Sequence, residues 1–588
     1  MKQLYTRWGR KLDPDHVWEE YPRPLMRRSS YCSLNGRWSC CFSDTPDLPK
    51  AYEEQILVPF SPESLLSGVG RQLQPGEYLW YERVLPKFYS GKGRLLLHFG
   101  AVDERCLVYI DGTKVGGHAG GYLPFTLDIT EQVRGKKAPR LTVRVMDDSD
   151  TSYHARGKQK LQRGGMYYTA QSGIWQSVWM EEVPEAFIGE LSLKPKADMG
   201  QVRVRVAADG DHPVRISVYP AGLYEDISPD APSLISPKEA PLLTAEGRTN
   251  TELTLDLPEV KMWNGKTPYL YPYTVTMGED QVESYFALRT FTIEPDGRRI
   301  PRICLNHVRQ FQRGVLDQGY WSDGLYTAPS EEAFLFDLTS MKDLGYHMIR
   351  KHGKVEPERW YYHCDRLGIV VWQDIVNGGS SYKDWYVTYL GTAFSYLGVK
   401  PGDRTHYLLS RTDPAGRREY AHEMVSTIRH LSAHPCIAAW TLFNEGWGQF
   451  QTRAMTRLAK KTDPTRLIDS ASGWFDEQCG DINSIHNYFF PMTLKPEEKR
   501  AAVISEFGGY TYTIPEHSTG DDLYGYGDYA NLTALQGAYE EREVEVNRLI
   551  PKGLCASVYT QVSDIEDETN GIFTYDREVQ KLKLSSVI

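Results

Sequence analysis

The sequence predicts a multidomain protein in which a jelly-roll β-sandwich and an immunoglobulin-like β-sandwich precede a C-terminal (β/α)8 TIM barrel. The chain has 588 residues, which is too many for one hydrophobic core. Short apolar runs separated by Gly, Pro and Asp fill the first half, and this pattern is typical of antiparallel strands. After residue 295, strand-like and helix-like segments alternate, as they do in a parallel barrel.

Composition and charge restrict the class of protein. Hydrophobic residues make up 41% and charged residues 24%, and the net charge of −10 gives no reason to expect nucleic acid. No apolar run approaches the ~20 residues of a membrane span, and the first residues lack the apolar core of a signal peptide. The nine cysteines are scattered without metal-ligand spacing. We expect a reduced, cytoplasmic protein with no nucleic-acid or membrane partner, and a homo-oligomer is left open.

Residues 1–185 are expected to form the jelly roll. The runs Arg94–Phe99 and Cys106–Ile110 read as strands, and Asp111-Gly112 follows the second run directly. An Asp-Gly pair between two apolar runs is a strong signal for a tight hairpin. A closed pair of sheets is the natural way to cover so many short strands.

Residues 186–295 are expected to form the immunoglobulin-like sandwich. Val202–Val206 alternates apolar and basic residues, and Tyr271–Met277 reads as a late strand. The stretch 228–246 is rich in Pro, Ser and Ala and predicts a loop or a long hairpin. About 110 residues with frequent turn signals fit such a domain.

Residues 296–588 are expected to form the barrel. A helix is predicted over 330–344, a strand over 347–350, a helix over 360–367 and a strand over 368–372. The active face of such a barrel lies at the carboxyl ends of its strands.

Two glutamates stand where strands of this barrel should end. Glu445 follows the apolar run 437–443 and precedes Gly446, and Glu506 follows the apolar run 501–504 and precedes Phe507-Gly508. Two carboxylates that face each other across one cavity suit glycoside hydrolysis. Either glutamate alone has a plain alternative, because a strand often ends in a charged residue that only meets water.

The pair resembles the two active-site signatures of glycoside hydrolase family 2, the β-galactosidase and β-glucuronidase family. In that family an Asn-Glu pair supplies the acid/base, and a later Ser-Glu-Phe/Tyr-Gly supplies the nucleophile. The segments Tyr78–Arg83, Gly116–Phe125 and Ser172–Trp179 resemble its sugar-binding-like domain. The resemblance implies a retaining, exo-acting β-glycosidase with Glu445 as acid/base and Glu506 as nucleophile. It implies a glycoside or oligosaccharide substrate. We expect no cofactor and no metal.

The strand ends also carry seven predicted substrate-binding residues. By resemblance, Asn444 contacts the sugar 2-hydroxyl, while Arg350 and Tyr488 position the nucleophile. A strand-end cap, a structural salt bridge and a packed core tyrosine are the respective alternatives. The full set comprises Asn444, Arg350, Asp374, His486, Tyr488, Trp447 and Trp474.

Departures from the family pattern bear on the substrate. Tyr167 stands where the β-galactosidases carry a sugar-contacting Asp, and Leu316–Gly319 replaces their Asn-x-His-Glu, which weakens both a lactose-type specificity and a magnesium site. No Asn-x-Lys triplet follows Glu506, which argues against ordinary glucuronides. The basic run Arg350–Lys354 can neutralise an acidic sugar such as a galacturonide, although such runs are often solvated.

On the family resemblance as a whole, a β-galactosidase-like activity is favoured. A β-hexuronidase of the same family and a non-catalytic carbohydrate-binding protein on the same scaffold are the alternatives. A nucleotide or redox enzyme lacks support, because no Gly-rich phosphate loop opens a helix after a strand.

Overall fold

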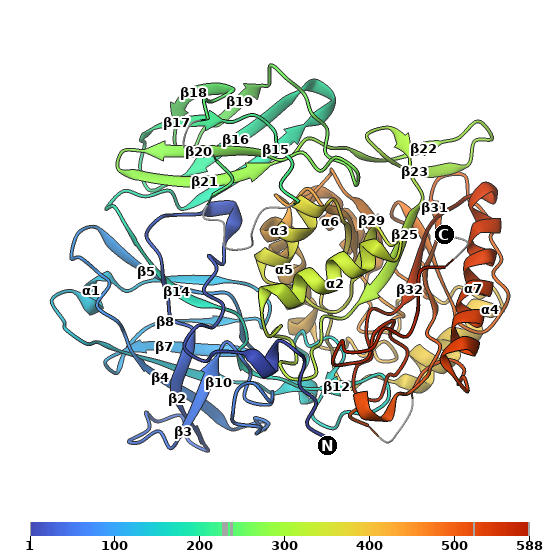
Figure 1. The fold of residues 1–588 in the computed structure, drawn as a ribbon, viewed down its shortest axis with the longest axis horizontal. Coiled ribbons are helices and arrows are strands. Elements are labelled where there is room, and N and C mark those ends of the chain that lie inside the picture. The colour runs from blue at the N-terminus through green and yellow to red at the C-terminus, as the bar shows by residue number, and fades with distance from the viewer. Residues whose placement is uncertain (1, 226–232, 236–238, 521–523, 586–588) are drawn as a thin grey trace.

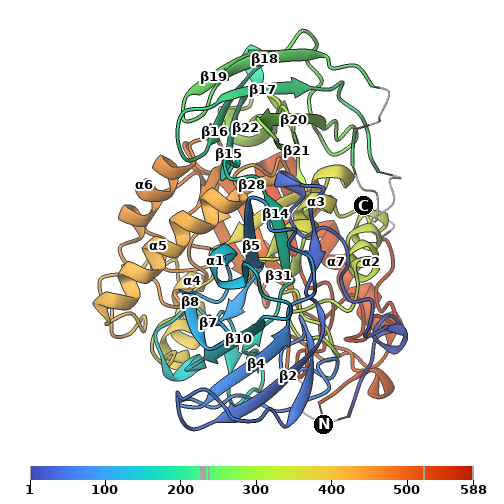
Figure 2. The same ribbon diagram turned by 90° about the vertical axis from the view of Figure 1, so that its left-hand side faces the viewer.

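The computed structural model describes residues 2–225, 233–235, 239–520 and 524–585. Two β-sandwiches and a parallel barrel make up this part of the chain (Figure 1). The immunoglobulin-like sandwich lies at one end of the molecule, and the jelly roll lies beside the barrel (Figures 1 and 2). The predicted fold class is confirmed.

The jelly roll consists of a four-stranded sheet, in the order β1-β14-β5-β9, and a six-stranded sheet, in the order β3-β2-β4-β10-β7-β8. At the predicted hairpin, Asp111 and Gly112 have φ values of 47° and 77°, as a type I′ turn requires. The strands are β1 (Cys32–Ser33), β2 (Gly36–Ser43), β3 (Glu54–Val58), β4 (Tyr78–Val84), β5 (Arg94–Phe99), β7 (Arg105–Ile110), β8 (Thr113–Ala119), β9 (Phe125–Asp128), β10 (Arg140–Met146) and β14 (Val178–Val183).

Shorter elements complete this domain. Strands β6 (Val102–Asp103) and β13 (Gly173–Ile174) pair with each other, as do β11 (Gln159–Lys160) and β12 (Tyr168–Thr169), and α1 (Thr130–Val133) follows β9.

The second sandwich has a three-stranded sheet, β15-β16-β19, and a four-stranded sheet, β18-β17-β20-β21. Residues 228–232 and 236–238 of the predicted loop lie outside the described residues, whereas 243–246 belong to β18. The strands are β15 (Glu190–Lys196), β16 (Gln201–Ala207), β17 (Pro213–Val218), β18 (Leu243–Arg248), β19 (Glu252–Asp256), β20 (Tyr271–Met277) and β21 (Asp280–Phe286).

A small sheet of β22 (Phe291–Pro295), β23 (Pro301–Leu305) and β24 (Val308–Arg309) leads into the barrel. The predicted domain limit at residue 295 falls in the turn between β22 and β23.

Eight parallel strands form the barrel sheet in the order β29-β28-β27-β26-β25-β32-β31-β30. They are β25 (Gln312–Asp317), β26 (Met348–Lys351), β27 (Val370–Asp374), β28 (Ile437–Thr441), β29 (Leu467–Asp469), β30 (Ile482–Asn487), β31 (Ala501–Gly508) and β32 (Leu554–Thr560). The helices around it are α2 (Glu331–Asp343), α3 (Glu358–Leu367), α4 (Gly391–Tyr396), α5 (Pro414–Leu431), α6 (Thr452–Thr462) and α7 (Leu532–Leu549).

The predicted helix–strand–helix–strand series over 330–372 is confirmed by α2, β26, α3 and β27. The alternation is not strict elsewhere, because residues 470–481 and 488–500, all of them described, connect strands without a helix.

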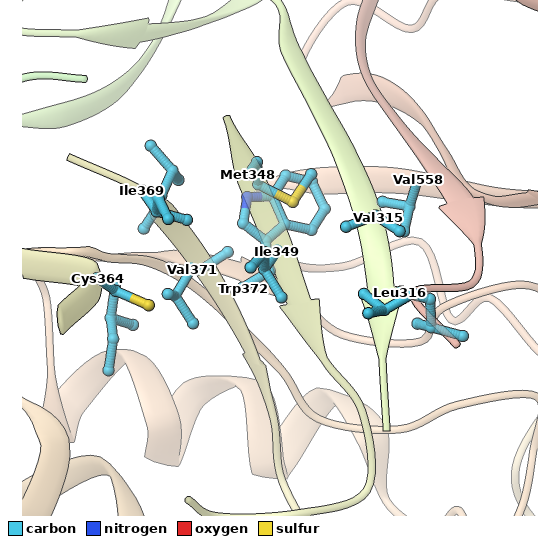
Figure 3. Packing of buried hydrophobic residues seen from close by; sticks show 14 of the residues in the cluster. Val315, Leu316, Met348, Ile349, Cys364, Ile369, Val371, Trp372 and Val558 are labelled. Atoms are coloured by element: carbon cyan, nitrogen blue, oxygen red, sulfur yellow. The ribbon is translucent and has the colours of Figure 1, made fainter. Parts of the chain in front are cut away.

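The barrel strands are apolar on both faces because they are covered inside and out. Val315, Met348, Val371 and Val558 are each 0% exposed, and their side chains pack between neighbouring strands (Figure 3). A rigid sheet of this kind fixes the positions of the residues at its carboxyl edge.

The N-terminal segment connects the domains. Thr6 Oγ1 donates to Asp323 Oδ2 of the barrel at 2.8 Å. Arg28 forms ion pairs with Glu181 on β14, at 3.0 Å, and with Asp280 on β21, at 2.9 Å. No described helix is both long and apolar enough to cross a bilayer.

Candidate active site

The two predicted glutamates lie together at the carboxyl edge of the barrel sheet. Glu445 follows β28 and is 9% exposed, and Glu506 lies within β31 and is 5% exposed. One carboxylate oxygen of each glutamate and one ring nitrogen of His486 all lie within 4.8 Å of one another. Two residues 61 positions apart, 445 and 506, therefore share one small volume.

Glu506 is held at both oxygens. Arg350 Nη1 donates to Oε1 at 2.9 Å, and the Tyr488 hydroxyl donates to Oε2. Burial alone would raise the pKa of the Glu506 carboxyl, but the positive charges of His486, Arg350, His352 and Lys158 outweigh it and hold this pKa below its ordinary value of 4.5. The arrangement keeps Glu506 ionised and fixed in orientation.

His486 lies between the two carboxylates. Its Nδ1 is 2.7 Å from Glu445 Oε1, and its Nε2 is 3.5 Å from Glu506 Oε1. Nε2 is also 2.8 Å from the Ser472 hydroxyl. The imidazole thus orients Glu445 and lies between the two carboxylates.

Arg350, fully buried on β26, connects three of the predicted residues. Its Nε and Nη2 donate to the two Asp374 oxygens at 3.1 and 2.9 Å, and Nη2 also donates to Asn444 Oδ1 at 2.8 Å. Asp374 Oδ2 lies 2.5 Å from His352 Nδ1 as well. Asp374 therefore has bonds to protein groups at both oxygens and acts first as a support for Arg350.

The two predicted tryptophans belong to one aromatic cluster beside the site. Trp447 is 5% exposed and stacks on Tyr167 at 5.7 Å between ring centres. Trp474 donates its indole N–H to the Val387 carbonyl at 2.6 Å and packs edge-on against His486. Trp447 lines the pocket, whereas Trp474 is absent from the pocket lining and contacts His486.

A pocket lies beside Asn444 and Asp374, where the jelly roll meets the barrel. It is lined by Gly157, Lys158, His352, Gly353, Asp374, Ile375, Asn377, Tyr382, Thr441, Leu442, Phe443, Asn444 and Trp447. Sequence reasoning missed Lys158 as a pocket residue, because it comes from a loop of another domain, for which no local pattern exists. His352 was included only as a member of the basic run.

The two lysines of the basic run do not line the pocket. Lys351 Nζ pairs with Asp317 at 2.5 Å and with Glu356 at 2.8 Å. Lys354 Nζ pairs with Glu356 at 2.9 Å and donates to the Gly319 and Tyr326 carbonyls. The expectation that this run neutralises an acidic sugar is corrected, because its lysines are buried and already neutralised.

The carboxylates and His486 are also the one described group with metal-ligand spacing. Arg350 already neutralises Glu506 there, and a second cation beside a buried guanidinium would be repelled. The donor set fits a carboxylate pair with bridging hydrogen bonds better than a divalent ion.

The fold and site together define a barrel protein with paired strand-end carboxylates, and comparison with known proteins specifies the family. Residues 308–509 match the TIM barrel domain of glycosyl hydrolases family 2, and residues 71–184 match that family's sugar binding domain. The chain belongs to glycoside hydrolase family 2.

Three similar proteins illustrate the relationship. A β-galactosidase of Leuconostoc mesenteroides is 23% identical over 500 residues, which are 80% of this chain and 44% of that protein. An uncultured Clostridium β-glucuronidase has a TM-score of 0.71 at 15% identity, with 96% and 97% of the two chains covered. A β-galacturonidase of Eisenbergiella tayi has a TM-score of 0.65 at 18% identity, with 95% of each chain covered.

The solved structures support the fold alone, because their sequence identities to this chain are only 15% and 18%. The chain spans 44% to 62% of the length of the first curated relatives that it matches.

Proposed function

We propose that this protein is a retaining β-glycosidase that removes a terminal sugar by double displacement. The observation that carries the proposal is the convergence of Glu445 and Glu506, whose nearest ligand atoms lie within 4.8 Å together with His486. Retaining enzymes hold their carboxyl groups about 5 to 5.5 Å apart, whereas inverting enzymes need about 6.5 to 9.5 Å to admit a water.

The environments of the two glutamates support different roles. Glu506, held by Arg350 and Tyr488 with a lowered pKa, suits the nucleophile that attacks the anomeric carbon. Glu445, the residue after Asn444, suits the acid that protonates the leaving oxygen and then the base that activates water. The family pattern assigns the same roles.

The neighbouring residues would act on the sugar and on the nucleophile. Asn444 is positioned by Arg350 and is available to the 2-hydroxyl, while Tyr488 and Arg350 orient Glu506. Trp447 would form a wall of the sugar site. Asp374 would hold Arg350 in place, and Trp474 would pack against His486.

For the substrate, we propose a terminal β-linked hexose or hexuronic acid. The similar proteins are named β-galactosidase, β-glucuronidase and β-galacturonidase, and the pocket gives no reason to prefer another class. A cytoplasmic location is part of the proposal, and the nine cysteines, all described and all unpaired, support a reducing compartment.

The test combines two variants with the stereochemistry of the product. Glu506→Gln should lower turnover of a nitrophenyl β-glycoside by on the order of 10⁴-fold or more. Glu445→Gln should keep slow turnover, because nitrophenol leaves without protonation, whereas substrates with poor leaving groups should lose about 10²- to 10⁴-fold. Proton NMR of the wild-type reaction should detect the β-anomer first.

Full activity of either variant on the preferred substrate would contradict the assignment, as would an α-anomer as first product. A protein that binds glycosides in calorimetry but hydrolyses none of a nitrophenyl sugar panel would be the non-catalytic alternative.

A further inference from the structure

Lys158 is a residue of the jelly roll that reaches the pocket of the barrel. Its loop is fixed to the barrel because the Arg156 and Gly157 N–H groups both donate to the Asn377 carbonyl at 2.9 Å. The Lys158 ammonium lies 5.8 Å from the ring centres of both Trp447 and Tyr168. It lines the same pocket as Asn444.

No carboxylate of the described residues forms an ion pair with the Lys158 ammonium. Among the residues that the structure describes, its Nζ makes no hydrogen bond and no ion pair, although it is half-buried. Four basic groups nearby, Arg350, Lys351, Lys354 and Arg163, each pair with a carboxylate, and Arg156 donates to backbone carbonyls. Its neighbour Lys160 lies 3.9 Å from Asp384.

A second donor in the pocket is also unused. The Trp447 indole N–H is buried and has no hydrogen-bond acceptor in the described part of the chain. A sugar that fills the pocket would remove water from the Lys158 ammonium, and burying an unpaired charge is costly. A ligand that presents negative charge there would compensate this cost.

We propose that Lys158 binds an anionic substituent of the glycone, so that the preferred substrates are acidic β-glycosides. The inference rests on the proposed function and specifies the substrate class of the same site. A carboxylate, as in a hexuronic acid, and a sulfate ester share the required chemistry, because either accepts charge-assisted hydrogen bonds from an ammonium. This role belongs to a lysine of the jelly roll and not to Lys351 or Lys354 of the barrel, which are already paired with carboxylates.

The experiment measures kcat/KM for nitrophenyl β-galactoside, β-galacturonide, β-glucuronide and β-galactoside 3-sulfate. Wild type should favour at least one acidic substrate over the neutral galactoside. Lys158→Met should lower the acidic-to-neutral ratio by about 10- to 150-fold, the range for one charge-assisted hydrogen bond. Lys158→Arg should restore most of the ratio, because it keeps the charge.

Lys160→Met is the matched control, because Lys160 lies two residues away on β11, carries the same charge and is absent from the pocket lining. Its ratio should match wild type. Thermal melts of every variant check the fold. The uronide and the sulfated substrate distinguish the two sources of negative charge.

Three outcomes separate this inference from the function on which it rests. Hydrolysis of the neutral sugar alone would overturn the inference and leave the proposed function intact. Equal losses on acidic and neutral substrates in Lys158→Met would also overturn it, since Lys158 would then act only through Glu506. A wild type that cleaves none of the substrates would overturn the proposed function itself.

Discussion

Basic and hydroxyl side chains surround the Glu506 carboxylate and offset the cost of burying its charge. Arg350 and His486 lie against its Oε1, and the Tyr488 hydroxyl occupies Oε2. Tyr488 is itself stacked on Tyr526 with 4.0 Å between ring centres, so its hydroxyl has little freedom to turn away. Preorganised donors of this kind spare the site from reorganising during reaction.

A pH profile tests this charge balance. Because the pKa of Glu506 is lowered from 4.5, the carboxylate stays ionised as pH falls through its ordinary range. The acid limb of wild-type kcat/KM should therefore lie below pH 4.5. Arg350→Gln removes one of the lowering charges and should move this limb to higher pH.

An acid limb of wild type well above pH 5 would contradict a lowered pKa for the nucleophile. Circular dichroism melts must accompany Arg350→Gln, because the substitution also leaves Asp374 without its main partner. Tyr488→Phe is a milder second variant, expected to lose about 10- to 150-fold in kcat/KM through one charge-assisted hydrogen bond.

Site residues at the ends of barrel strands could be predicted from the sequence, but a pocket residue that another domain contributes could not. Glu445, Glu506 and Arg350 each stand at a recognisable junction between an apolar run and polar residues. Lys158 precedes no such junction, and its approach depends on a backbone contact with Asn377 that only the folded chain provides. Asp374 was predicted at the right place, yet its bonds to Arg350 could not be foreseen.

At the scale of an element, the end of β28 explains how Glu445 enters the site. Glu445 has a backbone φ of 52° and Gly446 has a φ of 78°, so the chain turns sharply after Asn444. The Glu445 N–H donates to the Ser472 carbonyl at 2.9 Å, and the Ser472 N–H donates to the Phe443 carbonyl at 2.8 Å. These bonds compensate the uncommon backbone conformation and fix the carboxylate.

Gly368 ends α3 and gives a prediction at the same scale. Its φ is +72°, and an added Cβ would lie 2.9 to 3.1 Å from backbone atoms of Gly265 in the immunoglobulin-like domain. Gly368→Ala should therefore lower the free energy of unfolding by ~1 to 2 kcal/mol, because alanine is strained in the left-handed conformation. The close contact with Gly265 should add a steric cost of about 1 kcal/mol or more.

Gly278 is the matched control, since its φ is +57° but no atom lies within 4 Å of an added Cβ. Urea unfolding of both alanine variants measures the difference in free energy of unfolding. Equal losses in the two variants would show that the contact with Gly265 relaxes without cost.

Element prediction succeeded where the period of the apolar residues was clear and failed where tertiary packing decides. α2 and α3 have apolar residues at helical spacing and were placed within a few residues of their observed ends. The long connection over 375–413, with its short α4, gave no such pattern, and it covers one side of the site. Residues 470–500 lack the helices that a regular barrel would place there.

On the scale of the whole molecule, Arg28 joins the two sandwiches through buried charges. Glu181 on the jelly roll is 0% exposed, and burial by itself would raise its pKa. The charges of Arg23 and Arg28 are among the causes that reverse this and lower the pKa of Glu181 to about 2. The domains are therefore held in place by ion pairs that depend on pH.

The sign of this dependence follows from the lowered pKa. The carboxylate of Glu181 contributes stability that is fully present above pH 4.5 and is lost as pH falls toward about 2. Glu181→Gln should destabilise the protein at pH 7 by about 3 to 5 kcal/mol, because Arg28 loses a buried partner. The difference between wild type and variant should shrink below pH 4.5.

Glu185 serves as the control, because it pairs with Arg94 on the surface with its own side chain 74% exposed. Glu185→Gln should change the free energy of unfolding by less than about 1 kcal/mol at every pH. A Glu181→Gln deficit that is the same at pH 3 and pH 7 would contradict the linkage.

The order and kind of the three domains could be predicted, because length and the period of apolar residues change along the chain. How the domains dock could not, because Arg28, Glu181 and Asp280 lie far apart in sequence and no local pattern marks them as partners. The same limit hid the contribution of the jelly roll to the pocket.

Because the jelly roll contributes to the pocket, the residues that line it and the two glutamates come from different segments of the chain. The proposed catalytic pair lies on β31 and just after β28, whereas one wall of the neighbouring pocket is the loop Gly157–Lys158. Under the proposed function, substitutions in that loop would chiefly alter which compounds are accepted, while Glu445 and Glu506 keep their places on the barrel. Substrate preference and bond cleavage would then depend on separate segments of the chain.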